Sequence, residues 1–273
     1  MIGANARPAR IHHEVIMQPT AIITGASSGI GEAFAHLLAR EGYRPVLIAR
    51  RQAELERVAG AIVSTIDVDP VVMSRDLSTP DAAMKIQAEM DQLGLFPDLL
   101  VNNAGFGLMG SSMVLDLDEQ IEMVDLNVRT LTELSLVYSR LMCLRGHGGI
   151  INVSSVGGTL PGPNMAVYYA TKAYILNLTE ALSVELKPLG VQITAVVPGV
   201  TKTNFHRRAG MEDSLLMRIA MPMSAQQVAL LGYRGHCRGH RVVTTGLFNR
   251  LATWCTQFVP HTILLPVTAK LHT

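Results

Sequence analysis

Short runs of apolar residues alternate along the chain with longer segments in which apolar residues recur every three or four positions. The short runs predict buried strands, and the longer segments predict helices with one apolar face. Strands are expected at Thr20 to Thr24, Pro45 to Ala49, Val71 to Arg75, Leu99 to Asn102, Ile150 to Val153, Val191 to Val197 and Val242 to Thr245. Because this alternation calls for a parallel sheet covered on both faces, we predict an α/β fold, a single-domain doubly wound sheet of about seven strands.

Several helices have recognisable ends. The first helical segment carries one apolar stripe over residues 30–38 and stops before Gly42, which stands where a C-terminal cap belongs. A capping residue, a proline and an early acid at Ser78 to Asp81 predict that another helix begins there. Two longer helices are expected from about Asp118 to Leu144 and from Val167 to Leu186.

No linker, repeat or shift in composition divides the chain, so we expect one folded domain over residues 18–250. Residues 1–17 are expected to form a disordered tail. Arg7 and Arg10 precede the first acid of the chain, as in transit peptides, and translation could also begin at Met17.

Residues 251–273 form a C-terminal extension with several large apolar side chains. Trp254, Phe258 and Ile263 would wall a substrate pocket, join a subunit interface or rest on a membrane surface. Pro260 and Pro266 favour the first two alternatives. A membrane span is not expected, because no apolar run reaches the roughly 18 residues that a spanning helix needs.

The composition indicates a compact globular protein, with 48% hydrophobic and 16% charged residues in a chain of 273. A net charge of +1 gives no electrostatic footprint for nucleic acid, and the basic pairs Arg50-Arg51 and Arg207-Arg208 stand alone in the sequence. Cys143, Cys237 and Cys255 are far apart and form no C-x-x-C motif, which suits a reducing, cytoplasmic compartment.

A glycine-rich turn joins the first expected strand to the first helix. Its sequence from Gly25 to Gly31 has the spacing G-x-x-x-G-x-G. In this position Gly25 allows a tight turn, Gly29 lets a pyrophosphate approach the backbone, and Gly31 permits close packing of helix on strand. The turn therefore predicts a dinucleotide site, although glycines here could also be purely structural.

The end of the second strand indicates which dinucleotide binds. An NAD enzyme places an acid there to hold the ribose hydroxyls, whereas a 2'-phosphate is held by a guanidinium. Arg50 and Arg51 occupy this place and no acid does. We therefore predict NADP(H) rather than NAD, the alternative being two solvated arginines at a helix start.

Tyr168 and Lys172 lie four residues apart in an expected helix, and Ser155 precedes the tyrosine by thirteen residues. Residues at this helical spacing share one face, so the ammonium can sit beside the phenol. We expect the positive charge to lower the phenol's pKa from its usual value near ~10 towards neutrality, where a general acid works best. The three residues predict a proton-transfer site, although the spacing alone also occurs by chance.

Together these motifs resemble the short-chain dehydrogenase/reductase family over about Thr20 to Phe205. The resemblance implies a Rossmann fold, with the glycine turn, including Ser27, Ser28 and Ile30, at the cofactor. It further implies cofactor contacts from three later segments and from the catalytic tyrosine and lysine. These segments are Asp76-Leu77, Asn103-Ala104-Gly105 in the motif N-N-A-G, and Pro198-Gly199-Val200 with Thr203.

The resemblance implies four catalytic residues, which are Asn127, Ser155, Tyr168 and Lys172. Asn127 would hold a water in a proton relay, and Lys172 would also bind the nicotinamide ribose. Ser28 departs from the basic residue that many NADP-preferring relatives carry there, which leaves phosphate recognition to Arg50. The expected reaction is hydride transfer between NADP(H) and a ketone, aldehyde or secondary alcohol.

Two other functions were weighed against this one. A regulator that senses NADP(H) without turnover would usually lack one of the acid-base residues, and all four are present here. An epimerase or dehydratase of the extended branch shares Tyr-x-x-x-Lys, but it typically has a different glycine spacing and a longer substrate region.

The substrate is expected to be hydrophobic, acyl-like or steroid-like. The residues expected to flank it are Leu160, Pro161, Met165, Tyr169 and Val200. Thr201 to Met223 is the expected lid, and its adaptable apolar residues are Phe205, Met211, Met217, Met221 and Met223. The alternative is that these side chains are ordinary core or interface residues.

No metal site is expected, because His236, Cys237 and His240 lack the paired spacing of zinc ligands. By the resemblance, the two long helices should pair between subunits and give a homodimer or homotetramer.

Overall fold

The computed structural model describes residues 18–211, 214–256 and 258–272. The expected tail at residues 1–17, with its weak transit-peptide signal and its second start at Met17, lies outside the described residues.

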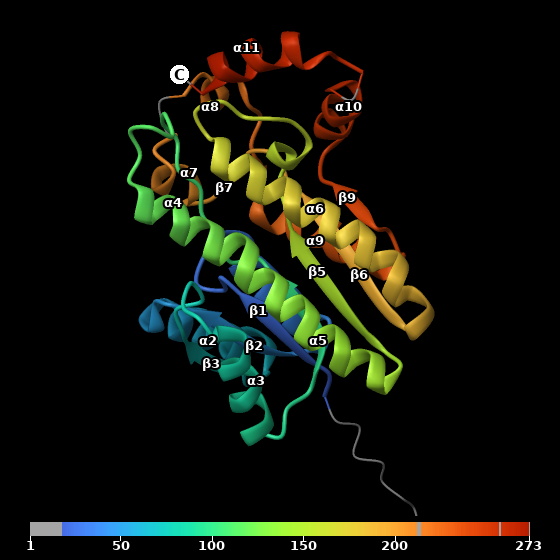
Figure 1. Cartoon of the computed structure of the whole chain (residues 1–273). Helices are drawn as coiled ribbons and strands as arrows, with labels where there is room; N and C mark the ends of the chain where they lie inside the picture. The colour runs from blue at the N-terminus through green and yellow to red at the C-terminus, as the bar shows by residue number, and fades with distance from the viewer. Residues whose placement is uncertain (1–17, 212–213, 257, 273) are drawn as a thin grey trace, which may run out of the picture.

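Seven parallel strands form one sheet in the order β3-β2-β1-β4-β5-β6-β9 (Figure 1). The strands are β1 Thr20–Thr24, β2 Arg44–Ala49, β3 Val71–Ser74, β4 Pro97–Asn102, β5 Gly148–Val153, β6 Val191–Val197 and β9 Val242–Thr244. All seven expected strands are confirmed, with ends that differ by up to two residues. Two further strands of two residues each, β7 Thr201–Lys202 and β8 Met223–Ser224, pair with each other beside the site and were not predicted.

Helices cover both faces of the sheet. The main α-helices are α1 Gly29–Arg40, α2 Gln52–Ile66, α3 Ala82–Gln92, α4 Leu117–Val124, α5 Leu131–Arg145, α6 Ala166–Leu186 and α9 Ala225–Cys237. The shorter or later ones are α7 Phe205–Arg208, α8 Leu215–Ile219, α10 Leu247–Thr256 and α11 His261–Leu271. Single 3-10 turns occur at η2 Val156–Thr159 and η3 Lys187–Leu189.

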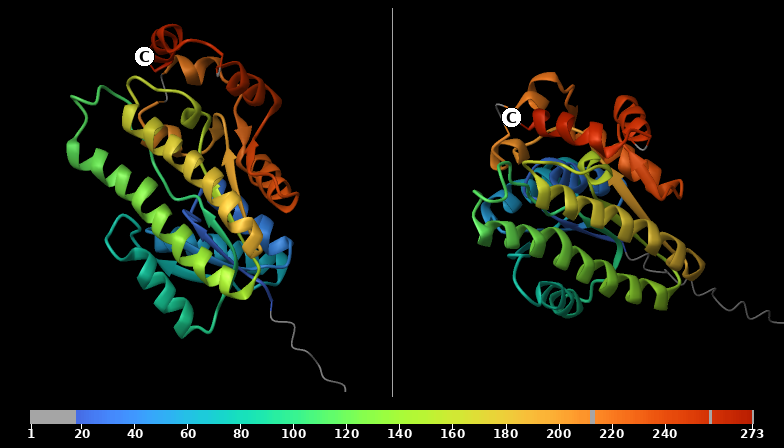
Figure 2. Two further views of the ribbon diagram at one scale, coloured as in Figure 1. Left: turned by 45° about the vertical axis from the view of Figure 1, so that its right-hand side comes forward. Right: turned by 45° about the horizontal axis from the view of Figure 1, so that its top comes forward.

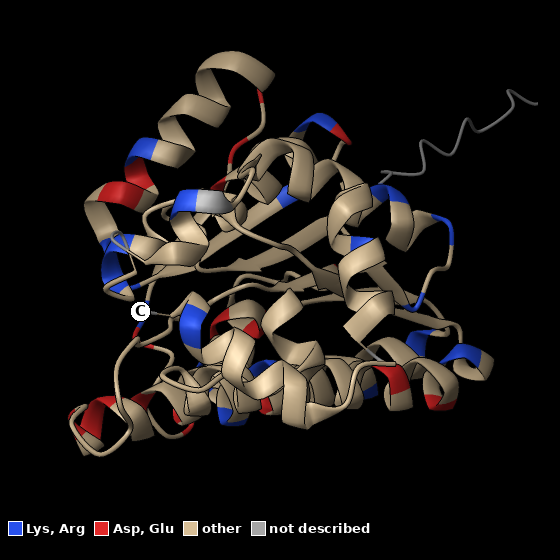
Figure 3. Ribbon diagram, turned by 90° about the horizontal axis from the view of Figure 1, so that it is seen from above, with Lys and Arg blue, Asp and Glu red and all other residues tan. Residues whose placement is uncertain are grey.

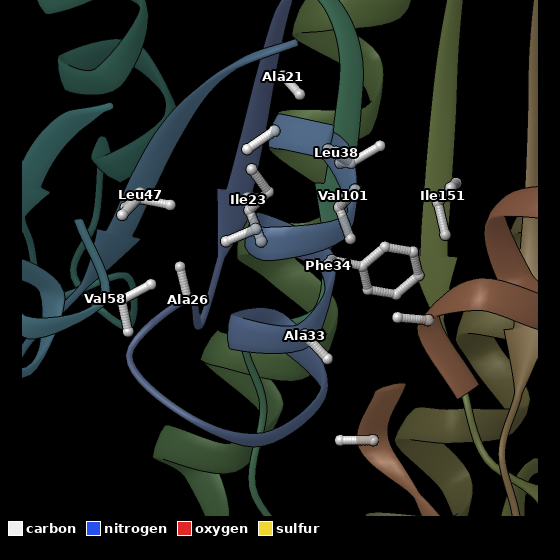
Figure 4. Close-up of a cluster of buried hydrophobic side chains, with 14 of the residues drawn as sticks. Ala21, Ile23, Ala26, Ala33, Phe34, Leu38, Leu47, Val58, Val101 and Ile151 are labelled. Carbon is white, nitrogen blue, oxygen red and sulfur yellow. The ribbon is translucent and has the colours of Figure 1, made fainter. Parts of the chain in front are cut away.

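Alternate side chains of each strand enter two separate cores. On one face, Ile23 of β1 and Val101 of β4 pack under α1, α2 and α9. In Figure 4, the ring of Phe34 extends from α1 towards Ile151 of β5. On the other face, Ile22 and its neighbours pack under α3, α5 and α6. Burial on both faces explains why the strands are continuous apolar runs.

The expected helix from Asp118 to Leu144 is interrupted by one π-helical segment, η1 Asp125–Thr130, between α4 and α5. A π-turn holds one extra residue per turn, so the side chains before and after it are rotated relative to each other. Asn127 lies in this segment and is fully buried.

The expected helix start at Ser78 to Asp81 is wrong by a few residues. Asp76 accepts hydrogen bonds from the Ser78 amide and hydroxyl at 3.0 and 2.8 Å, and these bonds hold the residues in a turn. Asp81 then adopts a left-handed conformation with φ 63°, and α3 begins only at Ala82. The local side-chain hydrogen bonds compete successfully with the helix here.

The last two helices lie together at one end of the molecule in the views of Figures 1 and 2. This is the end to which the carboxyl ends of the strands point, since α10 follows directly on β9. Among the described residues, no helix has the length and apolar character needed to cross a bilayer.

Candidate active site

A cavity of about 700 Å³ opens beyond the carboxyl ends of the strands. It lies where the strand order reverses, with β1 between β2 and β4, which is the usual ligand position in open α/β sheets. Its wall includes all the predicted cofactor residues except Gly31, and three of the four predicted catalytic residues. The predicted residues that line it are Gly25, Ser27, Ser28, Gly29, Ile30, Arg50, Arg51, Asp76, Leu77, Asn103, Ala104, Gly105, Ser155, Tyr168, Lys172, Pro198, Gly199, Val200 and Thr203.

The glycine turn is shaped so that no side chain fills the space in front of it. Gly25 has φ 67°, and a Cβ there would lie 2.8 Å from the Asn103 amide nitrogen. Gly31 does not line the cavity. Because it has no side chain, the Gly25 carbonyl can pack directly against its Cα. A Cβ on Gly31 would lie 2.3 Å from the Gly25 carbonyl oxygen. The turn is therefore compatible with a phosphate approaching the backbone at the start of α1.

Five arginines line the cavity, and they come from distant parts of the chain. They are Arg50, Arg51, Arg75, Arg207 and Arg208. Arg51 donates to the hydroxyls of Ser27 and Ser28 at 3.1 and 3.3 Å, and so lies across the glycine turn. Asp76 is the one acid among the lining residues. The two basic pairs that stand alone in the sequence thus meet in one cationic site, which fits a polyphosphate cofactor.

Arg50 is not a free cation in this site. Its guanidinium forms a 3.1 Å ion pair with Glu122 of α4. Arg208, which the sequence did not single out, lies with its guanidinium carbon 4.1 Å from the centre of the Phe106 ring. Burial and the neighbouring charge of Arg50 lower the pKa of Arg208. The positive charge in this part of the cavity is therefore shared and not confined to Arg50.

The loop after β4 is held against β1 by one hydroxyl. Thr24 Oγ1 accepts the backbone N–H groups of Asn103 and Ala104 at 2.9 and 3.0 Å. The Asn103 side chain donates to the Thr24 carbonyl at 3.0 Å. Asn102 points the other way, into the interior, and donates to Asn152 at 2.9 Å. Asn103, the second asparagine of the N-N-A-G motif, thus faces the cavity, whereas Asn102, the first, joins β4 to β5 inside the molecule.

Tyr168 and Lys172 project from the first turns of α6, and Ser155 follows β5. The Ser155 hydroxyl hydrogen-bonds the phenol of Tyr168. The Lys172 ammonium lies 5.8 Å from the centre of the Tyr168 ring and donates to the Val153 carbonyl at 3.0 Å. Ser154 fixes this part of α6 by donating to the Lys172 carbonyl at 2.7 Å. The three predicted residues therefore form one cluster in the cavity.

The prediction that Lys172 lowers the pKa of the phenol is wrong for the chain by itself. Burial raises the pKa of Tyr168 to about 12, although the hydrogen bond with Ser155 acts in the opposite direction. Burial also lowers the pKa of Lys172 to about 8. Desolvation disfavours both charged forms and is the largest effect on the pKa of each residue.

Asn127 is buried behind this cluster and does not line the cavity. Its amide nitrogen donates to the Phe106 carbonyl at 3.0 Å and to the Thr171 hydroxyl at 3.1 Å. Its oxygen accepts the Phe106 N–H at 3.2 Å. The side chain thus joins η1, the loop after β4 and α6, and these contacts leave its predicted role in a proton relay untested.

The expected substrate residues separate into two groups. Five of them line the cavity, and these are Met165, Tyr169, Val200, Phe205 and Met211. The others do not, and these are Leu160, Pro161, Met217, Met221 and Met223. Met221 is 88% exposed, while Met223 forms part of β8 and packs on the core under α1. The expected lid therefore contributes mainly through its first half.

The C-terminal extension reaches the cavity by a contact that the sequence did not indicate. His272 Nδ1 lies 2.8 Å from the Pro163 carbonyl, and its Nε2 lies 2.8 Å from the Tyr169 phenol. Trp254, Phe258 and Ile263 are all exposed and do not line the cavity, so they do not wall the pocket.

His236 and its neighbours show no metal-binding geometry. His236 is buried and shares a 3.0 Å hydrogen bond with Thr194, whereas Cys237 is exposed. Burial lowers the pKa of His236 to about 4. The described part of the chain contains no group of three or more His, Cys, Asp or Glu side chains placed to hold a metal ion.

Comparison with known protein sequences gives relatives of one kind. Very-long-chain 3-oxoacyl-CoA reductase-B of Danio rerio is 34% identical over 191 residues, which cover 68% of this chain and 61% of that protein. A 7beta-hydroxysteroid dehydrogenase of Mediterraneibacter gnavus is 31% identical over 182 residues, which cover 67% of this chain and 68% of that enzyme. The chain thus spans about three fifths to two thirds of these relatives.

Solved structures share the fold over most of the chain. A short-chain dehydrogenase of Sphingobium yanoikuyae in complex with NADPH superposes with a TM-score of 0.78 and 28% identity, over 89% of this chain and 96% of that one. A 3-ketoacyl-(acyl-carrier-protein) reductase of Brucella melitensis complexed with NADH superposes with a TM-score of 0.73 and 27% identity, over 83% and 96%.

The family model of the short chain dehydrogenases matches residues 19–213, which include the glycine turn, the tyrosine and lysine of α6 and the loop after β6. Residues of this range also build the cavity wall described above. The chain therefore belongs to the short-chain dehydrogenase/reductase family.

Proposed function

We propose that this protein reduces a hydrophobic ketone or aldehyde with NADPH. The observation that carries the proposal is the cluster of Tyr168, Ser155 and Lys172 on the wall of a cavity that five arginines also line. NADPH, when bound, supplies the hydride. The chain itself has to orient the carbonyl group, donate a proton to its oxygen and hold the phosphates.

Tyr168 is the proposed proton donor. With its pKa raised to about 12, the phenol stays protonated at neutral pH and can give its proton to an oxygen that gains negative charge. Ser155 hydrogen-bonds the same oxygen. Lys172, with a pKa near 8, is still mostly protonated at pH 7 and stabilises the phenolate left after transfer.

The preference for NADPH is supported by the balance of charge around the cavity. Arg50 and Arg51 follow β2, where an NAD-binding acid would stand, and Arg208 adds a third guanidinium. Asp76 lies after β3, and its Oδ1 accepts hydrogen bonds from the Ser78 amide and hydroxyl. A 2'-phosphate would find cations after β2, whereas no acid stands there to hold a free ribose.

The hydrophobic substrate class is supported by the apolar end of the cavity. Met165, Tyr169, Phe205 and Met211 line it beside the phenol. The relatives in Danio rerio and Mediterraneibacter gnavus are named for acyl and steroid substrates. Methionine and aromatic side chains adapt to irregular apolar ligands of this kind.

Steady-state oxidation of NADPH with a panel of long-chain acyl, steroid-like and small polar carbonyl compounds tests the proposal. Tyr168→Phe should lower kcat by a factor of about 100 or more, because one preorganised donor to a developing oxyanion contributes that much. Its affinity for NADPH, measured by calorimetry, should change little. Undiminished turnover in Tyr168→Phe, or preference for the small polar compounds, would contradict the proposal.

We further propose a homodimer or homotetramer that pairs α4–α5 and α6 with a second copy. Ile121, Tyr174 and Val184 expose apolar surface on these helices. Light scattering should then give a smaller mass for Val184→Arg, and the control Val63→Arg on α2, which covers the other face of the sheet, should not. An unchanged mass in Val184→Arg would argue against this interface.

A cytoplasmic location is also proposed, and the support for it is that Cys143, Cys237 and Cys255 are all free thiols. Fractionation of cells with an antibody to the chain would test it, and recovery in an oxidising compartment would contradict it.

A further inference from the structure

The helix α10 exposes a continuous apolar face. Leu247, Phe248, Leu251 and Trp254 recur at the spacing of one helix face, and each is between 58% and 82% exposed. Phe258 extends the same row just beyond the helix, and its ring centre lies 5.0 Å from that of Trp254. Such a row in water is unfavourable unless something covers it.

The neighbouring helix α11 is apolar on both sides. Its inner side carries the buried Leu264 and Thr268 and leads to His272 at the cavity. Its outer side exposes Ile263 and Val267. The two helices and Phe258 between them provide eight of the 22 exposed large hydrophobic side chains of the described residues. We call the outward-facing residues of α10 and α11 the C-terminal face.

The charge around the C-terminal face has one sign. No aspartate or glutamate occurs anywhere from Ser214 to the end of the chain. The nearby helices α8, α10 and α11 carry Arg218, Arg250 and Lys270, all exposed. Figure 3 looks onto this end of the molecule, and the acidic segments coloured there lie on other elements. An apolar face on helices that carry cations and no acid is complementary to an anionic lipid surface.

We propose that the C-terminal face binds the surface of a bilayer containing anionic lipid. The two short helices would lie in the plane of the interface, with the indole of Trp254 at the level of the headgroups. Neither helix can cross the bilayer. Asn249 of α10 packs against Gly199 of the cavity wall, so the bound surface would lie directly above the site.

A second copy of the chain fits this face less well. In a two-fold dimer the same patch meets itself, so Arg218 and Arg250 would face the identical cations of the partner. The helices of this face carry no acid that could pair with them across the dimer. The exposed apolar residues of α4, α5 and α6, in contrast, lie on elements that also carry acids, such as Asp118 and Glu180.

Tryptophan fluorescence tests this proposal directly, because Trp254 is the single tryptophan of the chain. Its fluorescence should shift to the blue on addition of vesicles of phosphatidylcholine with phosphatidylglycerol. Brominated lipids should quench it, and the shift should be weaker with phosphatidylcholine alone or at high salt. Sedimentation with the same vesicles gives the bound fraction independently of fluorescence.

Two sets of variants separate the apolar and the ionic contributions. Phe248→Ser with Leu251→Ser should lower vesicle binding by about tenfold or more, because two large side chains no longer enter the interface. Arg250→Gln and Lys270→Gln should each weaken binding to anionic vesicles by about fivefold and leave the weaker binding to phosphatidylcholine unchanged. Met84→Ser with Leu93→Ser, an equally exposed apolar pair near α3, is the matched control.

The proposal is overturned if Trp254 shows neither shift nor quenching with anionic vesicles, or if the α3 control loses binding to the same degree. It is also overturned if the Phe248 and Leu251 variant changes the mass by light scattering without affecting vesicle binding, since the face would then join two copies. Thermal unfolding followed by circular dichroism shows that each variant is folded. None of these readouts depends on NADPH turnover.

Discussion

The phenol of Tyr169 lies 2.8 Å from Nε2 of His272, which follows it by 103 residues in the chain. Because Nδ1 of the same ring faces the Pro163 carbonyl, which can only accept, Nδ1 must carry the proton. Nε2 then accepts from Tyr169. The imidazole is neutral in this arrangement, in agreement with the burial that lowers its pKa. The last helix is thus fastened to the residue next to Tyr168.

His272→Ala should destabilise the protein by about 2 kcal/mol, because the Tyr169 hydroxyl and the Pro163 carbonyl lose their partner. The KM for a large carbonyl substrate should rise severalfold while the affinity for NADPH stays unchanged, since α11 is held beside the apolar end of the cavity. Urea unfolding and steady-state kinetics measure the two effects. Tyr169→Phe combined with His272→Ala should cost less than the sum of the single changes, and strict additivity would argue against this contact.

Lys172→Met should make the cofactor-free protein more stable at neutral pH. The pKa of Lys172 falls from 10.5 to about 8 on folding, so below about pH 8 the folded chain holds a buried charge. This penalty is on the order of 3 kcal/mol at pH 7, less the hydrogen bond to Val153 that the variant loses.

The sign of this effect gives a pH test. Between about pH 8 and 10.5 the unfolded chain binds more protons at Lys172 than the folded chain, so the wild type gains stability there as pH rises. Urea unfolding at about pH 7 and about pH 9.5 should show the gap between Lys172→Met and wild type narrowing. Lys187→Met, an exposed lysine just after α6, should show no such trend. A gap that is constant with pH would contradict the burial argument.

Arg51→Ala should raise the KM for NADPH by about tenfold to a hundredfold, since one charge-assisted contact to a phosphate is lost. The KM for NADH should change less than threefold in the same variant, because NADH lacks the 2'-phosphate. Arg57→Ala on the same helix is the matched control, as Arg57 pairs with Glu32 and Glu54 and does not line the cavity. Equal loss for both cofactors would place Arg51 in a general structural role.

Two glycines of the first half should respond in opposite ways to alanine. Gly31→Ala puts a Cβ 2.3 Å from the Gly25 carbonyl, so it should cost roughly 2 to 4 kcal/mol of stability and weaken cofactor binding. Gly60 lies in the middle of α2 with nothing within 4 Å of a built Cβ. Gly60→Ala should therefore stabilise the protein by about 0.5 to 1 kcal/mol. Chemical unfolding measures both, and a neutral Gly31→Ala would contradict the packing argument.

The strands and the glycine turn could be predicted because their signals are local. A strand buried on both faces is an unbroken apolar run, and the turn needs glycines at fixed offsets. Strands β7 and β8 have only two residues each, which is too short for a pattern. The predicted start of α3 was wrong because the carboxylate of Asp76 accepts a hydrogen bond from Ser78 and holds it in a turn. The residues from Ser78 to Asp81 also match a helix cap, so the sequence alone does not reveal which of the two structures forms.

The distant parts of the site gave no local signal. Arg50 and Arg208 belong to two ordinary basic pairs, and only the fold brings them to one cavity. His272 is a lone histidine near the end of the chain, with no motif around it. The pKa of Tyr168 was predicted in the wrong direction because spacing on a helix reveals a neighbouring charge but not the depth of burial, and burial has the larger effect here.

Side chains before and after the π-turn η1 point in different directions around the axis of the helix between Leu117 and Arg145. Its first half aims Met123 and Asn127 at the loop after β4, and its second half aims Leu134 and Tyr138 at the sheet. A π-turn is equivalent to one residue inserted into an α-helix. Removing a single residue from η1 would restore regular α-helical winding and take away the wide turn from which Asn127 reaches Phe106 and Thr171. The extra residue of this helix is therefore what holds the loop after β4 and α6 together behind the site.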